Sequence, residues 1–280
     1  MNTEHQPQVC GHRGFAGLYP ENSILGFVKA VELGVFGLEM DVAVSADHRV
    51  IVSHEPWFDR KKCECPEDRD FGNFYTMTAE EIQQVNCGSL PDKRFPDRLL
   101  HSEPKPLMHQ VLEAAEKAAQ YFGKKPPVYF IEMKSDPELE FVYHPEYKFF
   151  ADLTVKDAKS LVPDDRIVIQ SFDIRVLRYI KSSYPEIACS LLSESPGGAA
   201  LKIEEAGFMP DVFGAHHLLF TREDSDFLKS RNIISAPWTV NKPADMRRMI
   251  DIGADIIITD YPDQLSKILQ ENRLTEPGIL

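Results

Sequence analysis

The chain has 280 residues, of which 43% are hydrophobic and 27% charged, a balance ordinary for a globular protein. Lysine and arginine total 31 against 44 aspartates and glutamates, so the formal net charge is −13. This acidic balance disfavours non-specific binding to nucleic acid or to an anionic membrane. No apolar run reaches the roughly 18 residues of a membrane span. We therefore expect no nucleic-acid partner and no stable membrane insertion, while the oligomeric state stays open.

The cysteines are odd in number and form no C-x-x-C pair: Cys10, Cys63, Cys65, Cys87 and Cys189. This pattern predicts reduced thiols in a reducing compartment. The N-terminal stretch MNTEHQPQVCGHRG lacks the basic and apolar regions of a signal peptide. Both features favour a cytoplasmic location.

Short apolar runs rich in β-branched residues alternate with amphipathic segments along the chain. Eight runs predict strands, at residues 9–14, 37–44, 128–134, 167–171, 187–192, 212–216, 233–240 and 256–259. Segments with helical spacing lie at 23–33, 107–121, 144–161, 174–183, 199–206, 222–230, 243–252 and 263–272. Strand–helix alternation predicts parallel strands, and eight units at this length predict a (β/α)8 TIM barrel. A doubly wound open sheet is the alternative.

One region breaks this alternation. A strand-like segment at 50–53 is followed by an irregular stretch, 55–106, that is rich in charge and proline. A structureless loop of that length is uncommon, so we interpret 55–106 as a small insertion subdomain over one barrel mouth, within a single catalytic domain. Inside it, Thr78 and Glu81 have the spacing of a helix capping box.

The strand predicted at 37–44, GLEMDVAV, carries two acidic residues on one side. Glu39 and Asp41 lie two residues apart, so they face the same way, and repulsion raises the pKa of at least one of them. Glu132 sits on the next predicted strand. Because chemistry in TIM barrels gathers at the carboxyl ends of the strands, we expect the three acids to converge there. Their oxygens suit one divalent cation, Mg²⁺ or Ca²⁺, unless each acid is an ordinary surface residue.

Two histidines and two basic residues lie at or near the ends of the same group of predicted strands as these acids. His12 and Arg13 end the first strand, His54 follows the hairpin strand, and Lys134 lies two residues after Glu132. Imidazole titrates near neutral pH, so His12 and His54 are candidates for general acid and base. Arg13 and Lys134 are candidate donors to a phosphate, salt-bridge partners of the acids, or both.

Five further polar or aromatic positions follow later strands. Gln170 is a candidate substrate-binding residue, and Trp238 is either an apolar wall for a ligand or a core residue. The pair at 216–217, two histidines, is interpreted as packing rather than catalysis. Asp260 is interpreted as a possible N-cap for the last helix.

Residues 11–55, GHRGFAGLYPENSILGFVKAVELGVFGLEMDVAVSADHRVIVSHE, resemble the signature of the glycerophosphodiester phosphodiesterase family. The pattern is H-R-G, P-E-N-[ST], a helix, E-x-D, a charged turn, apolar residues and histidine. The later pieces FIEMK, IQSFD, WTVN and ITDYP also match, so the resemblance covers nearly the whole chain. It implies a TIM barrel with a subdomain inserted after the second strand. It also implies metal-dependent hydrolysis of a glycerophosphodiester to glycerol 3-phosphate and an alcohol.

The resemblance also assigns roles to particular residues. The family's metal ligands correspond to Glu39, Asp41 and Glu132, and its acid–base histidines to His12 and His54.

Its phosphate-binding positions correspond to Arg13 and Lys134, while Glu21 and Asn22 are interpreted as support for the first loop. The insertion at 55–106 corresponds to the variable cap that shapes the alcohol side of the pocket.

The sequence departs from the family pattern in two places. Asp47-His48 replaces the usual D-G turn, where glycine supplies a positive φ, so this turn is expected to differ. His54-Glu55 replaces the usual H-D, which puts the support of the histidine in question.

Three alternatives remain at this point. One is a related enzyme acting on lysophospholipids, for which aromatic residues of the insertion would form an apolar rim: Trp57, Phe58, Phe71, Phe74 and Tyr75. Another is a barrel that binds phosphodiesters without turnover. The third is a barrel enzyme of other chemistry, such as a metal-dependent aldolase or an amidohydrolase.

Overall fold

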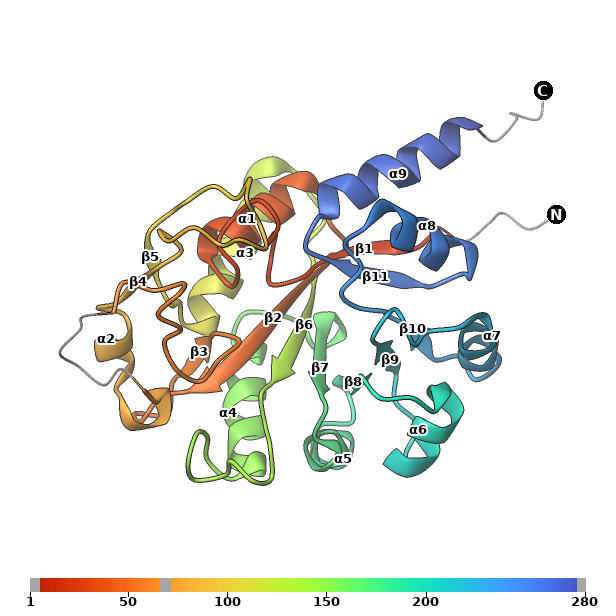
Figure 1. Ribbon diagram of the computed structural model, residues 1–280. Helices are drawn as coiled ribbons and strands as arrows, with labels where there is room; N and C mark the ends of the chain where they lie inside the picture. The colour runs from red at the N-terminus through yellow and green to blue at the C-terminus, as the bar shows by residue number, and fades with distance from the viewer. Residues whose placement is uncertain (1–5, 66–71, 276–280) are drawn as a thin grey trace.

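A computed structural model describes residues 6–65 and 72–275, and Figure 1 shows the path of the chain. Its main sheet contains eight parallel strands: β1 (Gln8–Gly11), β2 (Gly37–Val44), β6 (Val128–Met133), β7 (Ile167–Ser171), β8 (Ala188–Ser193), β9 (Val212–Ala215), β10 (Ile234–Ser235) and β11 (Ile256–Thr259). They run in the order β10-β9-β8-β7-β6-β2-β1-β11. The predicted (β/α)8 barrel is confirmed.

The barrel closes between the two ends of this strand order. The N–H of Val240 donates to the carbonyl of Ile258, and the N–H of Ile258 donates to the carbonyl of Pro237. These bonds join the segment after β10 to β11. The strand β10 is shorter than predicted because Pro237 has no N–H with which to continue a regular ladder of hydrogen bonds.

Helices follow the strands around the outside: α1 (Ile24–Leu33), α3 (Met108–Phe122), α4 (Tyr147–Lys159), α5 (Ile174–Ser183), α6 (Gly198–Ala206), α7 (Arg222–Ser230), α8 (Pro243–Asp251) and α9 (Pro262–Thr275). Local signals set their ends. The side chain of Ser23 accepts the N–H of Gly26 at the start of α1, and Gly34 ends that helix in the left-handed conformation. No helix in the described part of the chain has the length and apolar content needed to cross a bilayer.

The apolar core has two layers separated by the strands. Leu38, Met40 and Val42 of β2 pack outward against the helices, and all eight residues of β2 are buried. A smaller cluster lines the barrel interior and includes Phe130 of β6 and Val168 of β7. Because side chains alternate along a strand, Glu132 and Gln170, each two residues further along the same strand, also face the interior. Both are polar, and they lie toward the mouth of the barrel.

The segment between β2 and α3 forms a small structure beside the barrel (Figure 1). It contains β3 (Val50–Val52), η1 (Phe74–Thr76), α2 (Ala79–Ile82), β4 (Asn86–Cys87) and β5 (Glu103–Pro104). Its own apolar cluster includes Phe58, Phe74 and Ile82. The predicted capping box is present at the start of α2. The bounds 55–106 of the insertion stay a prediction.

The prediction that all five cysteines are reduced is wrong. Cys63 and Cys87 form a disulfide, whereas Cys10, Cys65 and Cys189 are free. An antiparallel bridge places residues 63 and 87 opposite each other, which their separation of 24 residues conceals in the sequence. The cysteine pattern therefore gives no support to a reducing compartment.

The hairpin turn before β3 accommodates its unusual residue directly. His48 adopts a positive φ of 59°, the conformation for which the family uses glycine. Its ring packs edge-on against Phe149 of α4, at 5.0 Å between centroids. This contact helps to stabilise a conformation that a residue with a Cβ otherwise disfavours.

Candidate active site

The three predicted acids converge at the mouth of the barrel. Asp41 of β2 and Glu132 of β6 are partners in the strand register, whereas Glu39 is the partner of the core residue Phe130. Glu39 therefore lies one layer deeper than the other two acids. All three are buried, and each offers an oxygen within 4.8 Å of the others.

Depth and neighbours give these acids different proton affinities. Burial, together with the charge of Asp41, raises the pKa of Glu39 to about 7. Burial also favours the neutral form of Asp41, but Lys134 and Arg13 hold the pKa of that carboxyl well below its usual range. This split agrees with the expectation that one member of the pair titrates unusually high.

Two cations lie among the acids. Nζ of Lys134 is 2.6 Å from a Glu132 oxygen and 3.0 Å from Oδ1 of Asp41. Nε of Arg13 is 3.1 Å from Oδ2 of Asp41. Both basic residues thus form ion pairs with the acids and still line the same cavity as Glu39 and Glu132. The salt-bridge interpretation of Arg13 and Lys134 holds, and it leaves room for a role in phosphate binding.

The first turn after β1 brings its polar atoms to the acids through an unusual backbone. Arg13 has a φ of 49° and Gly14 a φ of 85°, which ends β1 earlier than predicted. The backbone N–H of Arg13 donates to Glu39 at 2.9 Å. Asn22, interpreted above as loop support, donates its amide directly to Asp41 at 2.8 Å. It therefore orients a carboxylate of the site.

His12 is held by a carboxylate from the far end of the chain. Its Nδ1 lies 2.7 Å from Oδ1 of Asp260. The other oxygen of Asp260, Oδ2, accepts a hydrogen bond from the amide of Asn241 at 2.6 Å. Burial opposes a charge on His12, but the carboxylates of Asp260 and Glu39 raise its pKa. The interpretation of Asp260 as a helix cap missed this contact. The only sequence signal for it was the family piece ITDYP, which carried no role.

His54 lies on the insertion side of the mouth. Its Nδ1 is 3.1 Å from Oε1 of Glu55, so the longer acid does reach the histidine. Burial opposes ionisation of Glu55, but its bond to His54 and the charge of Lys62 lower its pKa to about 2.

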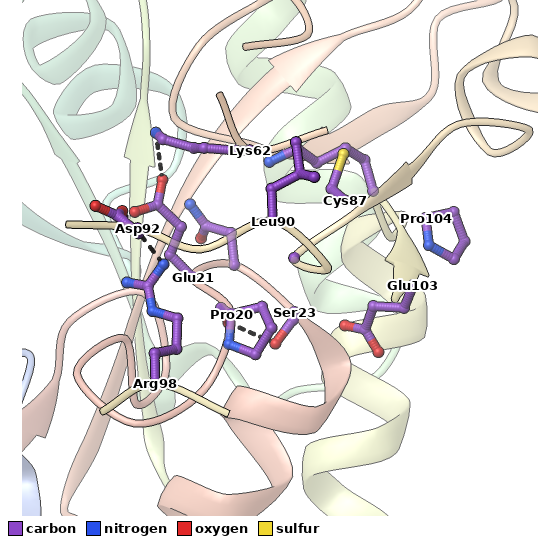
Figure 2. Close-up of a pocket in the computed structure, with 13 residues that line it drawn as sticks. Pro20, Glu21, Ser23, Lys62, Cys87, Leu90, Asp92, Arg98, Glu103 and Pro104 are labelled. Carbon is purple, nitrogen blue, oxygen red and sulfur yellow. Dashed lines mark hydrogen bonds and ion pairs between the residues drawn. The ribbon is translucent and has the colours of Figure 1, made fainter. Parts of the chain in front are cut away.

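Lys62 also bonds to Glu21 at 2.7 Å, and Glu21 in turn accepts from Arg13 at 3.2 Å. Figure 2 shows Glu21 with Lys62 on one side and the pair Asp92–Arg98 close by. These ion pairs connect the first loop to the insertion.

The cavity between the histidines has a volume of about 150 Å³. Trp238 and Phe172 line it, with their rings edge to face at 5.6 Å. The indole N–H of Trp238 donates to the carbonyl of Gly214, so the ring offers an apolar wall. Gln170 donates to Glu39 at 3.1 Å, and its buried carbonyl oxygen has no partner among the described residues.

Other candidate residues do not join the site. His216 stacks on His217 at 4.9 Å between centroids and does not line the cavity, as expected for packing. Among the insertion aromatics, Phe58 and Phe74 are buried against each other, so they form no exposed rim. Phe71, another of these aromatics, lies outside the described residues.

The barrel, with acids and histidines gathered at its mouth, places the chain among the TIM-barrel enzymes. The model of the glycerophosphoryl diester phosphodiesterase family matches residues 12–264, so the chain belongs to this family. A glycerophosphodiester phosphodiesterase of Caldanaerobacter subterraneus subsp. tengcongensis is 30% identical over 267 residues, which cover 94% of this chain and 98% of the relative.

Solved structures agree with this placement. A Silicibacter pomeroyi protein provisionally assigned as a glycerophosphoryl diester phosphodiesterase has a TM-score of 0.85 and 28% identity, with 95% of this chain and 94% of that chain covered. An Oleispira antarctica phosphodiesterase in complex with its product sn-glycerol-3-phosphate has a TM-score of 0.74 and 23% identity, with 95% and 97% covered. The second likeness shows the fold.

Proposed function

We propose that this enzyme hydrolyses glycerophosphodiesters to glycerol 3-phosphate and an alcohol, using one divalent cation and two histidines. The observation that carries the proposal is the convergence of three buried acids beside a cavity that two of them, Glu39 and Glu132, line together with both histidines. The complex of the Oleispira antarctica phosphodiesterase with sn-glycerol-3-phosphate supports the nature of the product. All members of the predicted set are present, which disfavours a barrel that only binds phosphodiesters.

The donor set fits a hard divalent cation. Glu39, Asp41 and Glu132 supply only oxygen ligands, as Mg²⁺ and Ca²⁺ prefer. The ammonium of Lys134 already lies between Glu132 and Asp41, which indicates that this space favours positive charge. When bound there, a divalent cation supplies Lewis acidity toward a phosphoryl oxygen and the attacking oxygen.

The two histidines are arranged alike for proton transfer. Each engages a carboxylate through Nδ1, His12 with Asp260 and His54 with Glu55. Nε2 of His12 lies 3.8 Å from Glu39, beyond hydrogen-bond distance, and in our proposal Nε2 of each ring serves the substrate. In our proposal one histidine takes the proton of the attacking oxygen and the other protonates the leaving alkoxide. The carboxylates around His12 favour its charged form, which is the form that donates a proton.

Arg13 and Lys134 stabilise the negative charge that develops on the phosphoryl group. Both line the cavity between the histidines. The attacking oxygen is either water or the glycerol 2-hydroxyl, and the second route passes through a cyclic phosphate. Early product analysis distinguishes these routes, because only the second gives a cyclic intermediate.

The test is release of glycerol 3-phosphate from substrates with different alcohols, with and without EDTA. We expect activity to disappear on chelation and to return with Mg²⁺ or Ca²⁺. Glu132→Gln should abolish activity, while Glu138→Gln, an exposed acid on the following loop, should not. Activity that survives full chelation would contradict the metal site.

A further inference from the structure

A second hollow adjoins the catalytic cavity and shares His12, Arg13 and Thr239 with it. We call it the alcohol groove. It has a volume of about 680 Å³, against about 150 Å³ for the catalytic cavity. The insertion contributes Arg94 and Phe95 to its wall, and the loops after β10 and β11 contribute Lys242 and Tyr261.

The sizes of the two hollows match the two arms of a phosphodiester. One arm, glycerol, is the same in every glycerophosphodiester, whereas the alcohol arm varies. The smaller cavity is lined by Trp238 and Gln170, and its size suits a short polyol. The larger groove shares His12 and Arg13 with the smaller cavity and has room for an alcohol of variable size.

The charge that the groove presents to solvent is positive. Its acids Glu21 and Asp260 are buried and already paired with Arg13 and His12. Lys242 is exposed, and no carboxylate of the described residues forms an ion pair with its ammonium. The side chain of Arg94 is 54% exposed and forms ion pairs with Asp92 at 2.7 Å and with Glu21 at 3.3 Å, so Lys242 is the cation of the groove without such a partner among the described residues. This positive surface stands out on a protein of net charge −13.

Resting on the function proposed above, we infer that the alcohol groove favours glycerophosphodiesters whose alcohol carries an additional anionic group, such as a second phosphate. Lys242 is the main determinant of this preference, and Arg94 contributes to it. A phosphate is a strong acceptor for both ammonium and guanidinium donors.

A cationic alcohol such as choline fits the groove less well. Quaternary ammonium groups bind to the faces of aromatic rings. The ring of Phe95 is already contacted by two guanidinium groups, with Arg98 at 4.1 Å and Arg94 at 5.3 Å from its centroid. A choline group there would meet like charge. The nearby carboxylates of Asp97 and Asp263 help to raise the pKa of Tyr261, but neither aspartate lines the groove.

The experiment compares two substrates that differ by one phosphate, glycerophosphoinositol and glycerophosphoinositol 4-phosphate. The readout is the ratio of their kcat/KM values, phosphorylated over unphosphorylated, for each protein preparation. Because the ratio is internal, a general loss of activity in a variant does not alter it. We expect a ratio of about 3 to 10 for the wild type at low ionic strength, falling toward one in 0.5 M NaCl.

Lys242→Glu should lower this ratio by at least about threefold, and Lys242→Gln should change it less and in the same direction. The matched control is Lys267→Glu, an exposed lysine of α9 that does not line the groove, which should keep the wild-type ratio. A wild-type ratio of one or below, or a ratio that neither Lys242 variant changes, overturns the inference and leaves the proposed function intact. Absence of glycerol 3-phosphate from both substrates and from glycerophosphocholine overturns the proposed function as well.

Discussion

The two histidines of the mouth lie in different parts of the molecule and in different surroundings. His12 belongs to the barrel, with 16% of its side chain exposed and a carboxylate partner, Asp260, that is 7% exposed. His54 belongs to the insertion side, with 35% exposed and a partner, Glu55, that is 22% exposed. The barrel thus holds one histidine in a buried environment, while the other follows the hairpin strand β3, next to the insertion, and is more exposed. The same pair of groups is built with unequal exposure to solvent.

The largest expected effect comes from removing either imidazole. His12→Ala and His54→Ala should each lower kcat for glycerophosphocholine by ~10²–10⁴, the contribution of general acid–base catalysis. Added imidazole should partly rescue His54→Ala, whose site is more exposed, and should not rescue His12→Ala. The control is His101→Ala, an exposed histidine of the insertion. Near-normal activity of His12→Ala would remove the basis of the comparison.

A second experiment tests how the insertion is stabilised. Replacing both Cys63 and Cys87 by serine should lower the free energy of unfolding by about 2–4 kcal/mol, because the disulfide restricts the unfolded chain. Urea denaturation measures the difference, and Cys65→Ser is the matched control. An unchanged unfolding midpoint would show that the disulfide adds nothing to the insertion.

The carboxylate partners sharpen the contrast between the histidines. Asp260→Asn should lower kcat roughly 10- to 100-fold, as loss of an orienting partner commonly does, and Glu55→Gln should cost less. Asp260 raises the pKa of His12, so the variant should lose the protonated imidazole at lower pH. The alkaline limb of the pH–rate profile of this variant should therefore shift to lower pH. Equal effects of the two variants would contradict the unequal roles.

The smallest effect concerns the deepest acid. Because the pKa of Glu39 is raised to about 7, protons compete with the cation below neutral pH. The affinity of the metal-free protein for Mg²⁺ should fall about tenfold per pH unit below 7 and level off above it. Calorimetry between pH 6 and 8, in two buffers of different ionisation enthalpy, measures both the affinity and the proton released. A flat affinity across this range would show that Glu39 does not take part.

Much of the fold could be predicted from the sequence because its signals are local. The apolar runs at 37–44 and 167–171 have the bounds of β2 and β7, and helical spacing gave α5 and α7 with the same ends. The first strand ended earlier than predicted, because Arg13 and Gly14 turn with positive φ. The residue types alone do not predict this backbone conformation, because arginine seldom adopts a positive φ.

The candidate site divides in the same way. The period of two along a strand is enough to place Glu39 and Asp41 on one side, whatever surrounds them. The unequal depth of the two acids depends on the register of β2 against β6, where Glu39 meets Phe130 and Asp41 meets Glu132. That register involves strands about ninety residues apart, and it is the burial it imposes that raises the pKa of Glu39.

By itself the sequence determined the strands, the helices and the inward direction of the acids, since these follow from neighbours along the chain. Only the tertiary structure decided which distant residues meet. His12 and Asp260 lie 248 positions apart and come together because β1 pairs with β11 as the barrel closes. Cys63 and Cys87 meet because the insertion folds back on itself. In both cases the contact depends on the pairing of segments that are separated along the chain, which a local sequence pattern does not contain.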